Sequence, residues 1–230
     1  MTPHSNLALL DWDGTLRKGY VLFDWVGHLV SKEIVAKEAH SQLTSLLFEY
    51  QNSKLSYRDL VINTANIYSV ALRGTQEQLV SSLASDFVQH DRKHLFEFTI
   101  PLLSHLQARN ISICIISGAP QSILVKYANL LPIDAVFGLS LETDARGIYT
   151  GAILENHGLY ETKQKVTENL TKNHQHVVLA IGNSKSDLPL LQAASNSFMI
   201  EPEGLGDFSD IAIVNRTEVL NAVTYRLRGS

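Results

Sequence analysis

The sequence predicts an α/β fold: a doubly wound, mostly parallel sheet with a helical cap inserted after its first strand. Three short apolar runs carry this prediction, at residues 7–10, 111–116 and 177–181, and each ends in small or polar residues. Short runs rich in Val, Ile and Leu that end in turn residues are typical of buried parallel strands. Helical patterns follow the second and third runs, and strands that alternate with helices form sheets covered on both faces.

The longest stretch without strand texture lies between the first and second runs. Apolar residues recur there at helical spacing, and Gly74 has the position of a helix stop. Because this block starts directly after the first strand, we predict a helical cap at residues 16–96. The α/β core is then formed by residues 1–15 and 97–230. The alternative is that these helices are further helices of a single core.

Two further elements complete the predicted core. Thr99 and Pro101 suit the first turn of a helix. Two alternating runs within residues 139–153 flank a turn-forming stretch at residues 144–147, which predicts a β-hairpin.

The composition is that of an ordinary globular protein, and it excludes some partners. Lys and Arg number 19 and Asp and Glu number 23, so the net charge is −4. There is no dense basic run, so a nucleic-acid partner is not expected. No segment has the length and apolar character of a secretory signal or a membrane span, and the single cysteine, Cys114, lies in an apolar run. A cytoplasmic protein with no membrane partner is therefore expected.

Residues 11–15, Asp-Trp-Asp-Gly-Thr, are the most informative stretch. Asp11 and Asp13 point in the same direction if the strand continues through them, because side-chain direction repeats every two residues. Two carboxylates this close repel each other, so a cation beside them is natural. An ordinary Asp-Gly turn is the alternative, but the position at the end of an apolar strand favours a functional site.

Two weaker signals lie further along the chain. Ser117 and Gly118 follow the second apolar run, where a hydroxyl and a backbone N–H can hold a phosphate oxygen. Lys163 lies near the start of a predicted helix, where its charge opposes the helix dipole. Each has a structural alternative when taken alone: a common Ser-Gly turn and a solvated surface lysine. Lys165 competes with Lys163 for the inward position.

The third apolar run leads into residues 182–187, Gly-Asn-Ser-Lys-Ser-Asp. Asn183 and Asp187 both carry oxygen donors suited to a hard cation. The alternative is that Ser186 or Asp187 caps the helix that follows.

Together these pieces resemble the haloacid dehalogenase-like superfamily, and most closely its phosphoserine-phosphatase-like branch, subfamily IB. The ordered set is residues 11–15, then Ser117, then Lys163, then residues 182–187, and it covers nearly the whole chain. The resemblance implies a Rossmann-like core with a cap after the first strand. It also implies a Mg²⁺-dependent phosphatase that hydrolyses a small-molecule phosphate monoester through an aspartyl phosphate.

The resemblance also assigns roles to residues of this sequence. Asp11 attacks phosphorus, and Asp13 protonates the leaving alkoxide and then activates water. Lys163 offsets the negative charge of the phosphate. The implied phosphate-binding residues are Thr15, Ser117 and Gly118. The implied metal ligands are Asp11, Asp13, Asn183 and Asp187.

The sequence departs from the family pattern at Asn183, where the family usually has Asp. An amide oxygen brings no charge, so the metal is expected to bind more weakly, or Asp187 is expected to take over as the direct acidic ligand.

The substrate-binding residues of true phosphoserine phosphatases are also missing. Tyr20 stands where they carry an acidic residue, and Thr64 stands where they carry an arginine. Nearby Arg58 is an imperfect substitute, and Arg17 and Lys18 are expected near the cap entrance, with an ordinary linker surface as the alternative. Phosphoserine is therefore not the expected substrate, because an unpaired substrate charge in a closed site is costly.

Two other function classes remain as alternatives. A phosphotransferase or a dehalogenase of the same superfamily would keep the fold and change the chemistry, although dehalogenation leaves Asp13 without a role. A non-catalytic phosphate-binding or regulatory module would explain Asn183 but not the retained Asp11, Asp13 and Lys163.

Overall fold

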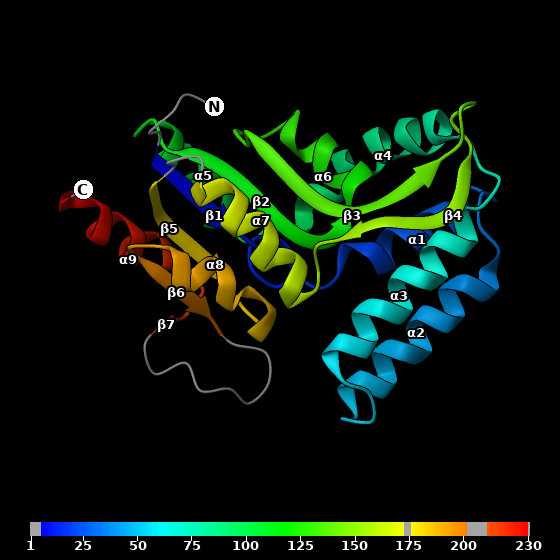
Figure 1. The fold of residues 1–230 in the computed structure, drawn as a ribbon, viewed down its shortest axis with the longest axis horizontal. Coiled ribbons are helices and arrows are strands. Elements are labelled where there is room, and N and C mark those ends of the chain that lie inside the picture. The colour runs from blue at the N-terminus through cyan, green and yellow to red at the C-terminus, as the bar shows by residue number, and fades with distance from the viewer. Residues whose placement is uncertain (1–5, 173–175, 202–210, 230) are drawn as a thin grey trace.

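In the computed structural model, residues 6–172, 176–201 and 211–229 are described. Within these ranges seven strands form one sheet in the order β4-β3-β2-β1-β5-β6-β7 (Figure 1). All neighbouring strands are parallel except β3 and β4, which are antiparallel. The strands are β1 (Asn6–Leu10), β2 (Ser112–Pro120), β3 (Ala135–Thr143), β4 (Tyr149–Asn156), β5 (His176–Gly182), β6 (Ser197–Ile200) and β7 (Ala212–Val214).

The central strand β1 is buried on both faces of the sheet. Its side chains alternate, so Ala8 and Leu10 join one apolar cluster while Leu7 and Leu9 join the other. The first cluster includes residues of α5 (Thr99–Gln107), α6 (Gln121–Ala128) and α9 (Val219–Arg226). The second includes residues of α7 (Tyr160–Lys172) and α8 (Leu188–Ala193). Helices thus cover both faces, which confirms the predicted doubly wound α/β class.

The second predicted strand differs most from the structure. β2 begins at Ser112 and continues through Ser117 and Gly118 to Pro120, whereas the sequence suggested a turn at the Ser-Gly pair. The pairing of β2 with β3 shifts register between Ile116 and Pro120, so the strand continues past the Ser-Gly pair through an irregularity. The predicted hairpin is present as β3 and β4.

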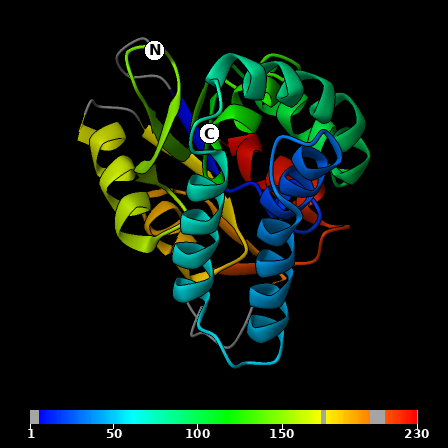
Figure 2. The same ribbon diagram turned by 90° about the vertical axis from the view of Figure 1, so that its right-hand side faces the viewer.

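The segment between β1 and α5 is helical, as predicted. It contains α1 (Val21–Ser31), α2 (Lys37–Gln51), α3 (Tyr57–Leu72) and α4 (Glu77–Asp91). Helices α2 and α3 lie side by side and extend away from the sheet (Figure 2). Helix α4 instead packs against α6 of the core. The division into a cap at residues 16–96 and a core therefore remains a prediction.

The two chain segments that lead into and out of this helical insert lie beside each other. The Lys18 N–H donates to the His94 carbonyl at 2.8 Å, and the Phe96 N–H donates to the Leu16 carbonyl at 3.0 Å. The Thr99 hydroxyl donates to the same Leu16 carbonyl at 2.6 Å, in the first turn of α5 as predicted. These bonds fix the insert at the carboxyl end of β1. Among the described residues, none of the helices combines the length and the apolar composition needed to cross a bilayer.

Candidate active site

The candidate site lies where three neighbouring parallel strands end. Asp11 follows β1, Ser117 lies in the last part of β2, and Asn183 follows β5. The Asp11 N–H donates to the Ile181 carbonyl at 3.0 Å, which continues the pairing of β1 with β5. Because β2 and β5 flank β1, side chains at these three positions converge on one edge of the sheet.

Lys163 connects two of the buried carboxylates at this edge. Its Nζ donates to Oδ1 of Asp11 at 2.8 Å and to Oδ1 of Asp187 at 2.5 Å. All three residues are at most 5% exposed. The helix α7 places this side chain, and Lys165, two residues later, is exposed. The structure therefore brings Lys163 and not Lys165 to the site.

Asp187 is held by donors of its own loop as well as by Lys163. Its Oδ2 accepts hydrogen bonds from the N–H of Asn183 at 3.0 Å and from the N–H of Ser184 at 2.9 Å. The Ser184 hydroxyl also lies 3.0 Å from this oxygen, and together they form a capping box for the 3₁₀ turn Lys185–Asp187. Both carboxylate oxygens of Asp187 are thus engaged by groups of the protein itself.

Thr15 lies between Asp11 and Asn183. Its hydroxyl is 3.0 Å from Oδ2 of Asp11 and 3.3 Å from Oδ1 of Asn183, so these two oxygens converge on one point. Gly14 permits this approach: its φ is +74°, and a Cβ there would lie 2.1 Å from the Asn183 side-chain nitrogen.

The Asp13 side chain is held by the helical insert. Its Oδ1 accepts a hydrogen bond from the Val21 N–H at 3.0 Å, at the start of α1. Burial raises the pKa of Asp13 to about 8, and the nearby positive charge of Arg17 opposes the rise. A carboxyl group with this pKa carries its proton at neutral pH.

Asp11 and Lys163 hold opposite charges in a buried place. Burial raises the pKa of Asp11, and Lys163 opposes that rise. Burial alone would lower the pKa of Lys163, but the charges of Asp11 and Asp187 outweigh it and raise the pKa. The lysine therefore stays an ammonium group over the whole neutral range.

The Ser117–Gly118 pair faces the same place from β2. Ser117 is buried, and its hydroxyl oxygen accepts a hydrogen bond from the Ala119 N–H at 3.3 Å. Gly118 lies against the backbone of Gly158, because a Cβ on Gly118 would be only 3.0 Å from the Gly158 Cα. Gly158 lies in the loop that leads into α7, the helix that carries Lys163.

A cavity that opens to solvent lies between this strand edge and the helical insert. The core contributes Asp11, Asp13, Ser117 and Gly118 to its wall. The insert contributes residues of α1 and α3, and Tyr20 and Thr64 both line it. A ligand in this cavity would contact the carboxylates on one side and the insert on the other.

Comparison with known proteins assigns this chain to a family. The sequence model described as haloacid dehalogenase-like hydrolase matches residues 8–192. The chain belongs to this family. The hydrolase is 24% identical over 213 residues to a protein named histidinol-phosphatase from Neisseria meningitidis serogroup C (strain 8013). The aligned region covers 86% of this chain and 91% of that protein.

Solved structures share the fold of this chain. A protein with unknown function from Bordetella pertussis Tohama I has a TM-score of 0.76 at 17% identity and covers 93% of the hydrolase and 99% of that chain. A probable phosphoserine phosphatase from Vibrio cholerae has a TM-score of 0.64 at 17% identity and covers 99% of the hydrolase and 68% of that chain. The family resemblance read from the four motifs is confirmed.

Two arginines that the sequence suggested for substrate binding lie elsewhere in the hydrolase. Arg58 makes a two-pronged ion pair with Glu161 of α7 at 2.7 and 2.9 Å, on the exposed surface. Arg17 is completely buried instead of lying at an entrance. Neither is among the described residues that line the cavity, whereas Tyr20 and Thr64 are.

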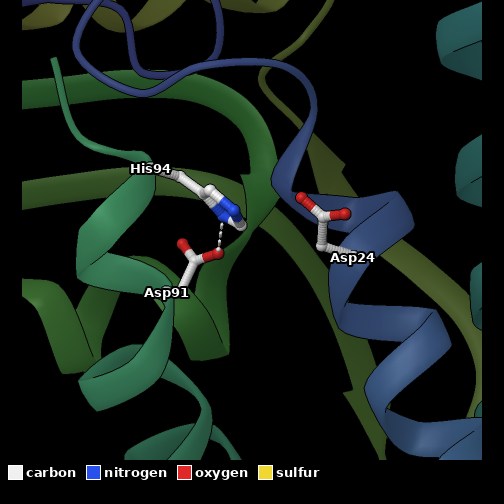
Figure 3. A group of neighbouring side chains, drawn as sticks. All are labelled: Asp24, Asp91 and His94. Atoms are coloured by element: carbon white, nitrogen blue, oxygen red, sulfur yellow. Dashed lines mark hydrogen bonds and ion pairs between the residues drawn. The ribbon is translucent and has the colours of Figure 1, made fainter.

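Arg17 is enclosed by a group that the sequence did not reveal. Figure 3 shows Asp24, Asp91 and His94 near one another, with His94 bonded to Asp91. One side-chain oxygen or nitrogen of each lies within 4.8 Å of the others. The Arg17 guanidinium contacts all three, at 2.6 Å for Oδ1 of Asp91 and 3.0 Å for His94, with a further ion pair to Asp24. The Tyr127 hydroxyl donates to the other oxygen of Asp91 at 2.6 Å. A metal ion is not needed here, because Arg17 already supplies the positive charge.

This cluster predicts an acid-sensitive contribution to stability. Burial alone would raise the pKa of Asp91, but the hydrogen bonds and charge of Arg17, helped by Tyr127 and His94, outweigh it and hold the pKa below its usual value. A depressed pKa stabilises the fold above the unfolded-state pKa of about 4, and this stabilisation is lost as the pH falls further. Asp91→Asn is expected to cost about 3 kcal/mol at pH 7 and progressively less at acid pH.

Thermal melting of both proteins between pH 7 and pH 3 checks this expectation. Asp86→Asn, an exposed position on the same helix, is the matched control and should change stability by less than about 0.5 kcal/mol. A constant difference between wild type and Asp91→Asn at all pH values would contradict the role given to the Asp91 charge.

One residue of the cavity wall was not predicted from the sequence. Tyr57, the first residue of α3, lines the cavity and hydrogen-bonds the Ser186 side chain. Its position directly after the helix cap Ser56 resembles any helix start, so the local sequence carries no signal for this contact.

Proposed function

We propose that this hydrolase is a Mg²⁺-dependent phosphatase that cleaves a small-molecule phosphate monoester through an aspartyl phosphate on Asp11. The observation that carries the proposal is the pairing of Asp11 with Lys163 at 2.8 Å, beside Asp13 on the wall of one cavity. Asp11 and Asp13, the proposed nucleophile and acid, then line one cavity, and the Lys163 ammonium group contacts Asp11.

The nucleophilic step has to overcome electrostatic repulsion. A carboxylate that approaches a phosphate dianion meets two negative charges, and each costs about 4 kcal/mol at ~4 Å and an effective dielectric constant of ~20. The Lys163 ammonium offsets part of this cost from a fixed position. In this proposal the Ser117 hydroxyl, the Gly118 N–H and the Thr15 hydroxyl hold the phosphate oxygens.

Asp13 supplies the proton that the leaving group needs. An alkoxide is a poor leaving group, and Asp13 is protonated at neutral pH because its pKa is about 8. After the alcohol leaves, the same side chain is a carboxylate and removes a proton from the water that attacks the aspartyl phosphate. The Val21 N–H holds the side chain in place through both steps.

The donor atoms at the strand edge fit a Mg²⁺ ion. Hard cations prefer oxygen ligands, and oxygens of Asp11 and Asn183 both lie within hydrogen-bond distance of the Thr15 hydroxyl. We assign the ion to the Asp11 carboxylate, the Asp13 carbonyl and the Asn183 side-chain oxygen. Asp187 is not assigned as a direct ligand, since both its oxygens already accept hydrogen bonds; it holds Lys163 and the loop that contains Asn183. When bound, the ion supplies positive charge that neutralises the phosphate.

Replacing Asn183 by Asp is expected to tighten Mg²⁺ binding at least about tenfold, because a charged oxygen replaces a neutral one. The check is the Mg²⁺ dependence of p-nitrophenyl phosphate hydrolysis in both proteins. Asn129→Asp adds the same charge at an exposed position and is the matched control. Equal Mg²⁺ affinity in wild type and Asn183→Asp would remove Asn183 from the ligand set.

Hydrolysis of p-nitrophenyl phosphate in the presence of Mg²⁺ tests the proposed activity itself. Histidinol phosphate belongs in the substrate panel because a relative with 24% identity is named for it. Release of inorganic phosphate, measured with and without an added alcohol, separates hydrolysis from phosphoryl transfer. A protein that binds phosphate and releases none from any ester would be a binding module.

A further inference from the structure

The wall of the cavity that faces the catalytic carboxylates is largely apolar. Helix α1 contributes Leu22 and Phe23 to this wall, and α3 contributes Leu60, Val61 and Ala65. Tyr20 and Tyr57 add aromatic rings, and the rings of Tyr20 and Phe23 lie 5.8 Å apart between centroids. The leaving group of a phosphate ester bound at Asp11 would be enclosed by these side chains.

Charged groups are nearly absent from the same wall. Among the described residues that line the cavity, Asp11 and Asp13 alone are ionised or ionisable near neutral pH, and no lysine, arginine or histidine is present. The two arginines closest in sequence to the residues of this wall form ion pairs elsewhere, Arg17 with Asp91 and Arg58 with Glu161. Thr64 is the insert's small polar side chain in this wall, and its hydroxyl donates to the Leu60 carbonyl at 2.7 Å.

This arrangement of side chains discriminates between charged and uncharged leaving groups. A carboxylate on the leaving group would lose its water and find no cation on the insert side, and it would face Asp11 and the phosphate on the other side. A ring or an aliphatic chain would instead replace water against apolar side chains. The penalty for an unpaired charge in an enclosed site is far larger than that for a wrong methylene.

We propose that the cavity selects phosphate monoesters of alcohols that have an aromatic or aliphatic body and no carboxylate. This inference rests on the proposed function and narrows its substrate class. It sets the hydrolase apart from enzymes whose substrates are phosphorylated hydroxy acids or amino acids.

Two esters that differ in one group test the inference on the wild-type protein. They are 3-phenylpropyl phosphate and its analogue with a carboxylate on the second carbon of the propyl chain. The neutral ester is expected to have a kcat/KM at least about a hundredfold higher. Phosphoserine is expected to behave like the carboxylate ester.

A pair of variants shows whether the absence of a cation from the wall causes the preference for the neutral ester. Thr64→Arg places a guanidinium on the wall, and Thr64→Met adds similar bulk without charge. The ratio of kcat/KM for the carboxylate ester to that for the neutral ester is expected to rise at least about tenfold in Thr64→Arg and to stay near wild type in Thr64→Met. Because each ratio is measured within one protein, a partly folded preparation does not change it.

The outcomes separate the two proposals. Hydrolysis of both esters with equal efficiency, or a preference for the carboxylate ester, would overturn the inference and leave the phosphatase proposal standing. A ratio that rises equally in both variants would also overturn it. Absence of hydrolysis of either ester and of p-nitrophenyl phosphate would overturn the proposed function, and the inference with it.

Discussion

Replacing Asp11 by Asn is expected to abolish hydrolysis of p-nitrophenyl phosphate, with a loss of at least about 10⁴-fold in kcat. An amide oxygen does not form a phosphoryl bond that water can then cleave, so the covalent route is closed. The substitution keeps the size of the side chain. It also leaves Lys163 paired with Asp187. The loss is therefore expected in a folded protein.

Steady-state kinetics and thermal melting of the same preparation check this result. Asp86→Asn makes the same chemical change on the exposed side of α4 and should retain full activity. If Asp11→Asn kept more than about one hundredth of the wild-type rate, Asp11 would not be the nucleophile.

Replacing Lys163 by Met is expected to impair both catalysis and stability. The fixed positive charge beside the phosphate is lost, which should lower kcat by about 10³-fold. Asp11 and Asp187 would then be left as buried carboxylates without their shared cation, at a cost of about 3–5 kcal/mol in the free energy of unfolding.

Lys165→Met is the matched control, because it makes the same change two residues later at an exposed position of α7. Urea unfolding and kcat/KM should both remain near wild type in that variant. Equal losses in the two variants would mean that the inward lysine has no special role.

The parts of the site that could be predicted from the sequence are those set by topology. Asp11 and Asn183 follow neighbouring parallel strands, so their meeting at one edge follows from the predicted sheet. The inward position of Lys163 follows from its helix and the resemblance. No such rule places Ser117 inside β2, since the irregular pairing of β2 with β3 depends on both strands.

The parts that could not be predicted depend on contacts distant in sequence or on backbone geometry. Arg17 is buried because Asp91, 74 positions later, and Asp24 enclose its charge, and no local pattern marks such a pair. The proposed choice of Asn183 over Asp187 as metal ligand rests on backbone N–H groups that donate to one oxygen of Asp187. The amino-acid sequence alone does not show the direction in which those N–H groups point.

The most direct test of the account is a search for the phosphoryl group on Asp11. Asp13→Asn should retain the first step with p-nitrophenyl phosphate, because p-nitrophenolate leaves without a proton, and should slow the second step, which needs a base. Acid quenching of this variant during turnover, followed by mass spectrometry, is predicted to find one phosphoryl group on the peptide that contains Asp11. Turnover with no phosphorylated enzyme, or with the group on another residue, would contradict the account.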